Sequence, residues 1–421
     1  MSFITNIQSV AKYESKILLR TWFFRIFTIL AALFLGFFNG MLLFNEDMGG
    51  IVWLLKSIPS NLPYFSMLLL NTGQAVIAIF LASDFLKRDK KLDTSEVFYV
   101  HPLSNAEYVF GKIWGNLRAF LVLNILIMGM IMIFNIAASG VSVDWQSYII
   151  YFFLISIPTL IFIIGFSIFL MLILKNQALT FVILLGYIAL TVFYIGDKYY
   201  YLFDYIAYSL PFLKSSIIGF SNYDAIFNHR AIYLFAGIAF ICFTISLFNR
   251  LPNSKRSNYV WIIAGGIFIA LSILCGYNHV NSFSKAGENR KLYTSINNKY
   301  AKAPRMTVEK YSISVEQAPY EIITNVQMEA IAMSTSSQFA FCLNPGFQIL
   351  NVSAQEKPLT YTRDHQIILV DFGKEITCGD TVSFAMQYRG KADEFFCYLD
   401  IEPKVLQEES RQFLLNVDKK Y

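Results

Sequence analysis

Histidine is the side chain that most often takes part in metal binding and proton transfer, and its spacing here lacks the common zinc motif. The four histidines are His101, His229, His279 and His365, and no two of them are four residues apart. The H-E-x-x-H pair that binds zinc on a metallopeptidase helix is therefore absent. The G-x-x-x-x-G-K-S/T loop that holds nucleotide phosphates is absent as well. We expect this chain to contain no catalytic residues, no metal site and no cofactor.

The five cysteines divide between two parts of the chain. Cys242 and Cys275 lie in apolar runs, where a cysteine usually serves as a small buried side chain. Cys342, Cys378 and Cys397 lie in the more polar C-terminal part. Three is an odd number, so the sequence predicts no disulfide framework and leaves open whether two of them form a bridge.

Two short groups of residues inside apolar stretches have side chains suited to helix contacts. Asn71, Thr72 and Gln74 form a polar cluster, and polar groups in lipid face either protein or water. We expect this cluster to join helices or to line a translocation path. Gly36 and Gly40 form a small-x-x-x-small pair, which allows close helix packing within one chain or in a dimer.

The elements that must position these residues are mostly membrane-spanning helices. Hydrophobic residues make up 56% of the chain and charged residues only 15%, against about 25% in soluble domains. Apolar runs of 18 or more residues are long enough to cross a bilayer. The net charge of +5 is modest, which argues against nucleic acid as a partner. Seven spans are predicted, at residues 26–44, 65–84, 118–138, 148–174, 178–196, 231–248 and 259–277.

The basic residues predict the orientation of these spans. An amphipathic helix over residues 3–22, with Lys12, Lys16 and Arg20 at four-residue spacing, is typical of a membrane surface. One set of loops contains Lys87, Arg88, Lys90, Lys91, Lys112, Lys175, Arg250, Lys255 and Arg256. The alternate loops contain only Lys56, Lys198, Lys214 and Arg230. The more basic set belongs in the cytoplasm, so the N-terminus is predicted there and the C-terminal domain on the opposite side.

The segment 197–230 is aromatic without being purely apolar. It contains the run YYYLFDY, and tyrosines prefer the headgroup zone of a bilayer. We interpret this segment as short interfacial or re-entrant helices on the outer face. A plain external loop is the alternative.

Beyond the last span the periodicity of the sequence changes. Residues 282–304 are polar and are predicted to form a linker. From about residue 305 apolar side chains alternate with polar ones, and segments 366–370 and 382–388 have the composition of strands. Turns are predicted at residues 345–346, 373–374 and 378–380. These short strands indicate an all-β, sandwich-like soluble domain after the helical membrane domain.

The loop at residues 87–112 has the most specific pattern in the chain. It reads KRDKKLDTSEVFYVHPLSNAEYVFGK and contains an apolar patch that includes Phe98 and Tyr99. Ser104 and Glu107 form a capping-box pair that predicts a helix start, and this helix continues into the third span. We expect a helix, a tight turn and a second helix that project into the cytoplasm and fit a groove on a soluble partner. A helical hairpin without a partner is the alternative.

This loop resembles the cytoplasmic coupling segment of the membrane-spanning subunits of ABC-2 (type II exporter-like) transporters. The matching residues are Thr94, Glu96, Pro102, Ser104, Glu107, Gly111 and Lys112. Asp93, Ser95 and Asn105 replace the usual Gly, Leu and Arg. The resemblance extends over about residues 1–250. It implies that a separate ATPase subunit docks on this segment and that two permease chains, identical or different, form the pore. The implied coupling residues are Thr94, Glu96, Phe98, Tyr99, Pro102, Ser104, Glu107, Gly111 and Lys112.

The C-terminal part resembles the N-terminal β-domain of M1-family aminopeptidases. The similarity runs from residues 343–347 to 388–391, includes the segment 378–382, and covers about residues 305–421. Some permeases of the Bacteroidetes type are fused to such modules. The zinc motif of that family is absent, and the resemblance ends at Tyr421, about where the catalytic domain would begin.

The sequence therefore predicts three parts: a transmembrane domain over residues 1–281, a linker over 282–304 and an extracytoplasmic β-domain over 305–421. The expected function is that of a non-enzymatic permease subunit of an ABC exporter in the bacterial inner membrane, with ATP bound by a partner subunit. Two alternatives remain: the anchor and first domain of a membrane-bound M1-type zinc metallopeptidase, and a sensor or scaffold whose outer domain binds a peptide or partner.

Overall fold

The computed structural model divides the chain into two compact units, one within Met1–Ser282 and one within Phe283–Glu409. It describes residues 3–44, 58–83, 103–138, 141–196, 198–210, 222–248, 255–318, 321–355 and 357–393, and positions 212, 214, 219–220, 396 and 399 between or beyond them. The boundary falls within one long helix, so the last turns of that helix belong to the second unit.

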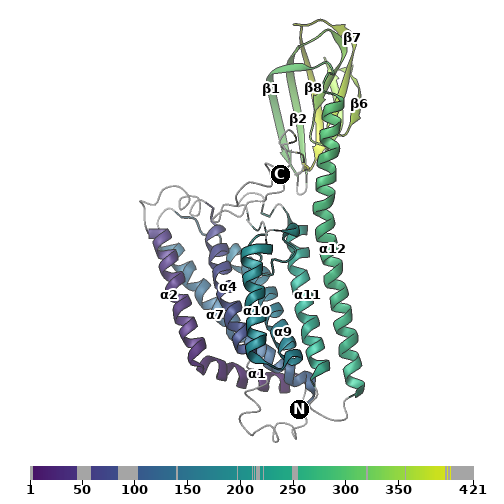
Figure 1. Ribbon diagram of the computed structural model, residues 1–421. Coiled ribbons are helices and arrows are strands. Elements are labelled where there is room, and N and C mark those ends of the chain that lie inside the picture. The colour runs from purple at the N-terminus through teal and green to yellow at the C-terminus, as the bar shows by residue number, and fades with distance from the viewer. Residues whose placement is uncertain are drawn as a thin grey trace. The chain divides into compact units, whose positions relative to one another are not determined.

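The first unit is helical, and seven helices of the described residues are long and apolar enough to cross a membrane. Its elements are α1 (Phe3–Arg20), α2 (Trp22–Phe44), α4 (Asn61–Ser83), α7 (Asn105–Ala137), α8 (Trp145–Tyr151), η1 (Phe152–Ser156), α9 (Ile157–Leu174), α10 (Gln177–Leu190), η2 (Thr191–Ile195), η3 (Tyr199–Tyr201), α11 (Tyr223–Leu247) and α12 (Lys255–Lys299) (Figure 1). The prediction of a polytopic helical membrane domain with about seven spans is confirmed. The third span begins earlier than predicted, because α7 starts at the capping pair.

The amphipathic helix predicted at the N-terminus is α1. It ends at Arg20 and is followed after Thr21 by the first span, α2. Its buried residues, Ala11, Glu14, Ser15 and Leu18, recur at three- and four-residue intervals and so share one face. That face packs against α7, and the opposite face is exposed.

The fourth span is interrupted by a π-helical turn, η1, directly before Pro158. Proline has no N–H group to donate to the carbonyl four residues earlier, which here belongs to Leu154. Arg230 supplies the missing donors: Nε donates to Leu154 O at 2.7 Å and Nη2 to Ile155 O at 3.3 Å. Arg230 was predicted to lie in an outer loop, and this prediction is wrong. Its side chain is 2% exposed within α11, because unpaired carbonyls at η1 hold the guanidinium in the protein.

The described part of the segment 198–222 consists of turns, and its regular helix is the single 3-10 turn η3. Tyr199, Tyr200 and Tyr201 all have left-handed backbone conformations, with φ of 53°, 58° and 64°. The carboxylate of Asp204 accepts hydrogen bonds from the backbone N–H groups of Ser209 and Leu210. These turns replace the predicted short helices, because Asp204 binds the backbone locally in place of a helical ladder.

The predicted linker over 282–304 is helical through Lys299, as the end of α12. Its composition of Lys, Asn, Ser and Glu tolerates helix, and the first proline after the span is Pro304. The final turns belong to the second unit and form hydrogen bonds within it. The Tyr293 hydroxyl donates to Asp393 Oδ2 at 2.7 Å, and Gln366 Nε2 donates to the Tyr293 carbonyl at 2.6 Å.

The second unit contains two antiparallel sheets. The larger sheet has the strand order β1-β2-β8-β4-β5 and the smaller one β3-β7-β6. The strands are β1 (Met306–Gln317), β2 (Ile322–Ala332), β3 (Ser336–Cys342), β4 (Phe347–Ala354), β5 (Lys357–Pro358), β6 (Thr360–Asp364), β7 (Ile367–Ile376) and β8 (Thr381–Gly390). Their inner faces meet in one hydrophobic core that includes Val326, Phe339, Ile368 and Phe384. The predicted sandwich-like β-domain is confirmed.

The turn predicted at residues 373–374 is an irregularity within β7. Gly373 has a φ of +66°, and its N–H donates to Asp371 Oδ1 at 2.8 Å, so the strand bends locally and continues. The predicted turn at 378–380 is present, with Gly379 at a φ of +93°. Cys342 and Cys378 are free thiols, and Cys397 lies outside the described residues.

Candidate functional site

The capping box predicted at the start of α7 is present. Ser104 is the N-cap residue, and its Oγ accepts a hydrogen bond from Glu107 N at 3.2 Å. Glu107 Oε2 in turn accepts from Ser104 N at 2.6 Å. Two backbone N–H groups at the helix start are thereby satisfied by side chains, which fixes where α7 begins.

Two glycines of α7 bring α1 into direct backbone contact. A Cβ atom built on Gly111 would lie 2.5 Å from Val10 Cβ, and one built on Gly115 would lie 2.8 Å from Ala11 O and 2.7 Å from Glu14 Cβ. No side chain larger than hydrogen fits at either position without moving α1. Gly111 and Gly115 are one helical turn apart, so they form a continuous notch for α1 on the surface of α7.

Hydrogen bonds on both sides of this notch join the same two helices. Asn6 Nδ2 donates to Glu107 Oε1 at 2.8 Å, so the capping carboxylate also binds α1. At the other end Ser15 Oγ donates to the Gly115 carbonyl at 2.8 Å, and Arg118 Nη2 donates to Ser15 Oγ at 3.0 Å. We call this contact, from Asn6–Glu107 to Ser15–Arg118, the α1–α7 junction.

The first turn of α7 also contacts the end of α11. Asn105 Nδ2 donates to the Phe248 carbonyl at 2.7 Å, and the rings of Tyr108 and Phe248 stack with centroids 5.4 Å apart. The Lys112 ammonium lies 5.0 Å from the centroid of the Tyr108 ring and is 3% exposed. Asn105, where the family resemblance would predict Arg, thus joins the start of α7 to the end of α11.

The structure therefore brings four of the predicted coupling residues together on α7: Ser104, Glu107, Gly111 and Lys112. The others, Thr94, Glu96, Phe98, Tyr99 and Pro102, lie outside the described residues. Sequence reasoning missed Asn6, Gly115, Ser15 and Arg118, which complete the α1–α7 junction. The available signal was the spacing of Gly111 and Gly115, which is the same small-x-x-x-small pattern as at Gly36 and Gly40.

The Gly36 and Gly40 pair packs much more loosely. A Cβ atom on Gly36 would meet Met130 of α7 at 3.6 Å, an ordinary contact, and one on Gly40 would meet no described atom within 4 Å. The pair therefore makes one contact with α7 at Gly36 and leaves Gly40 open.

The polar cluster predicted in the second span is buried between helices. Asn71 Nδ2 donates to Ser156 Oγ at 2.8 Å, Ser156 Oγ donates to Asn124 Oδ1 at 3.0 Å, and Asn124 Nδ2 donates to Gln74 Oε1 at 2.9 Å. Thr72 Oγ1 donates to its own helix, at Leu68 O. Asn71 and Gln74 thus join α4 to α7 and η1. Asn71 Oδ1 and Gln74 Nε2 have no partner among the described residues, so the cluster retains hydrogen-bonding capacity.

An ion pair fixes the turns that precede α11 to the start of the fourth span. Lys214 Nζ lies 2.6 Å from Asp144 Oδ2, and Ser147 Oγ donates to the same oxygen at 2.6 Å. Partial burial opposes ionisation of Asp144. The hydrogen bonds from Lys214 and Ser147 outweigh that effect, so the pKa of this carboxyl group lies below its usual range.

A helical unit with seven apolar spans, a surface helix held to the third span and a capped helix start define a multi-pass membrane protein. Residues 8–200 match a family model described as an ABC-2 family transporter protein. Residues 8–200 of the first unit are thus similar to an ABC-2 family transporter domain, and this match supports a permease of an ABC transporter. No curated protein matches the sequence.

The solved structures that resemble the chain include an M1 zinc metallopeptidase from Deinococcus radiodurans bound to a Tyr-Ser-Ala substrate, and a two-domain M1 zinc metallopeptidase bound to L-tryptophan or to L-arginine. Each is 14% identical, has a TM-score of 0.20, and the match covers 21% of this chain and 21% of that chain. The chain thus matches about a fifth of the length of these structures. At this TM-score the likeness gives no information about activity.

Proposed function

We propose that the chain is the membrane-spanning permease subunit of an ABC exporter and that residues 87–112 couple it to a separate ATPase subunit. ATP is bound and hydrolysed by that partner. The observation that carries the proposal is the α1–α7 junction. The last residues of the coupling segment lie at the start of α7 and contact α1 directly.

The junction gives a docked ATPase a mechanical route into the membrane. Force applied to residues before Ser104 acts on the capped start of α7, since Ser104 and Glu107 fix that start. Glu107 also binds Asn6, and the Gly111–Gly115 notch leaves no slack between the helices, so α1 moves with α7. Asn105 extends the same motion to the end of α11 through its bond to Phe248. A rigid contact of this kind transmits displacement because packed side chains deform little.

The proposal includes an orientation in the bacterial inner membrane. The N-terminus and residues 87–112 face the cytoplasm, where an ATPase is available, and the β-domain is periplasmic. Support comes from the basic loops and from the odd number of predicted spans. A second permease chain, identical or different, completes the pore, as the family resemblance implies.

Co-purification tests the proposal most simply. The tagged full-length chain is isolated from its native host, and a retained ATPase is identified by its G-x-x-x-x-G-K-S/T loop. We expect Phe98→Ala combined with Tyr99→Ala to reduce retention severely, since central aromatic anchors contribute about 2 kcal/mol or more each at interfaces.

A matched pair of aromatic residues outside the segment provides the control. Phe34 and Phe37 on α2 are 57% and 72% exposed, and their replacement by Ala removes similar apolar area far along the chain from residues 87–112. This variant should retain the ATPase like wild type. The coupling assignment is wrong if wild type retains no ATPase, or if both double variants retain it equally.

A further inference from the structure

The two sheets of the β-domain do not close on each other completely. A cavity of about 570 Å³ lies in this unit and is lined by residues of β1, β2, β3, β7 and β8 and by the end of α12. Its size falls within the range of small-molecule sites, roughly 300–1,000 Å³. The cavity borders β1, an edge strand of the larger sheet.

The inner face of β1 shows that this part of the sandwich is uncovered. Tyr311, Ile313 and Val315 alternate along the strand toward one face and are 59%, 58% and 57% exposed. Tyr311 pairs with Met328 of β2 and Ile313 with Val326, and both partners belong to the buried core. The apolar side chains of the core thus continue from β2 onto β1, where they are exposed.

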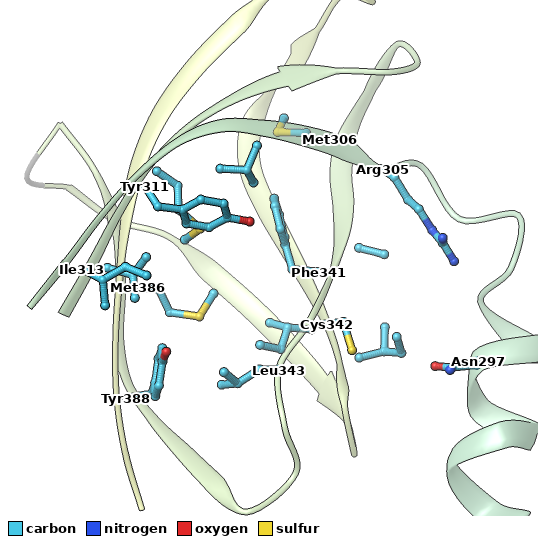
Figure 2. A pocket seen from close by; sticks show the side chains of 16 residues that line it. Asn297, Arg305, Met306, Tyr311, Ile313, Phe341, Cys342, Leu343, Met386 and Tyr388 are labelled. Carbon is cyan, nitrogen blue, oxygen red and sulfur yellow. The ribbon is translucent and has the colours of Figure 1, made fainter. Parts of the chain in front are cut away.

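The chemistry of the cavity is divided along its length. Most of its lining is apolar and rich in methionine, with Met306, Val308, Met328, Leu343, Ile368 and Met386 beside the rings of Tyr311 and Phe341. Figure 2 shows Arg305 and Asn297 at one end, and Ile313, Met386 and Tyr388 at the other. Methionine side chains adapt readily to a flexible apolar ligand.

The Arg305 guanidinium is available to a ligand. None of the ion pairs found among the described residues involves it. Its charge acts on the thiol of Cys342, an exposed residue that also lines the cavity: partial desolvation raises the pKa of Cys342, and the charge of Arg305 opposes that rise. The cation and the free thiol therefore mark the same end of the cavity.

We propose that this cavity binds a single acyl chain with an anionic head group, with the chain between the sheets and the head group at Arg305. An extended peptide fits less well, because its backbone amides would be buried without partners along the apolar lining. An alkyl chain has no such groups.

Cys342 provides a reporter in the full-length chain, reconstituted in phosphatidylcholine nanodiscs. Its alkylation by N-ethylmaleimide is followed by peptide mass spectrometry, with Cys378, which does not line the cavity, as internal reference. Two anionic probes, myristate and myristoyl-lysophosphatidylglycerol, distinguish a free fatty acid from a membrane lipid. Tetradecanol is the neutral counterpart.

We expect at least one anionic probe to slow alkylation of Cys342 about tenfold at ten times its dissociation constant, without affecting Cys378. Shortening the chain should weaken protection by about threefold to fourfold per methylene group. Tetradecanol should protect less than myristate, since it lacks the charge that Arg305 recognises.

Two pairs of variants separate binding from folding. Ile313→Trp should fill the mouth of the cavity and remove protection, whereas Val315→Trp, equally exposed on the same face but outside the lining, should retain it. Arg305→Gln should weaken protection by the anionic probe, and Lys302→Gln, at an exposed position outside the lining, should not.

Three results would overturn the proposal. The first is that neither anionic probe protects Cys342 below its micelle-forming concentration. The second is that tetradecanol protects as well as myristate, which removes the role assigned to Arg305. The third is that the matched controls lose protection together with Ile313→Trp and Arg305→Gln.

Discussion

The α1–α7 junction and the packing of α2 differ sharply, although both contain glycines at the same four-residue spacing. At Gly111 and Gly115 an added Cβ atom would lie under 3 Å from atoms of α1, whereas at Gly40 it would meet no described atom within 4 Å. The difference lies in the partner surface. Small side chains of α1 and flanking hydrogen bonds to α1 bring the backbones together at the junction. Beside the glycines of α2, the Asn39 side chain instead hydrogen-bonds to Ser66 of α4. Spacing permits a close crossing, and complementary residues on the second helix create one.

The largest expected effect comes from filling the notch. Gly115→Leu should destabilise the full chain by about 3 kcal/mol, because α1 must leave its place on α7. Gly40→Leu, the same change at the open position, should have little effect. The midpoints of thermal unfolding of the purified proteins measure both. Equal destabilisation by the two substitutions would remove the distinction between the regions.

A somewhat smaller effect is expected from the hydrogen bonds beside the notch. Glu107→Ala leaves the Asn6 amide and the Ser104 N–H without their acceptor, which should cost about 2 kcal/mol. Asn6→Ala removes only the bond between helices and should cost about 1 kcal/mol. The midpoints of thermal unfolding of the two variants, compared with wild type, separate the contribution of the helix cap from that of the Asn6–Glu107 hydrogen bond. The junction is misassigned if Asn6→Ala is as damaging as Glu107→Ala.

The helix cap alone should contribute less than the whole junction. Ser104→Ala removes one capping acceptor, at a cost of about 1 kcal/mol, and leaves the notch intact. Ser104→Asp keeps an acceptor at the N-cap and should be close to wild type. Retention of the ATPase should fall partially for Ser104→Ala and not for Ser104→Asp. A loss as severe as that expected for the aromatic pair at residues 98–99 would contradict this order.

The smallest effect is expected at Gly36. A Cβ atom there would lie 3.6 Å from Met130, an ordinary contact distance, so Gly36→Ala should fit. Because alanine also has the higher helix propensity, the melting midpoint should be unchanged or slightly raised. A clear destabilisation would mean that α2 packs as tightly at Gly36 as α1 does on α7.

Much of this architecture could be predicted from local sequence. The spans follow from long apolar runs, the β-domain from alternation, and the start of α7 from the Ser104–Glu107 pair, because each signal acts over a few neighbouring residues. Figure 1 shows the spans as the long helices of the first unit.

The features that the sequence did not predict depend on contacts between segments far apart in the chain. Arg230 looked like a loop residue, but carbonyls freed at η1 accept from it 75 or more residues away. Asn6 and Glu107 are 101 residues apart, and nothing local marks them as partners. Gly115 was visible only as a spacing, and its importance depends on the small residues of α1. Such pairings are set by packing, which a single sequence does not reveal.

Photo-crosslinking tests the central claim, that residues 87–112 dock on an ATPase, most directly. A photoreactive amino acid replaces Tyr99 in one variant and Phe37, 72% exposed on α2, in another, and both are irradiated in native membranes. The account predicts that the first captures a protein with a nucleotide-binding G-x-x-x-x-G-K-S/T loop and that the second does not. Capture of no ATPase from the Tyr99 position, or equal capture from both positions, would contradict it.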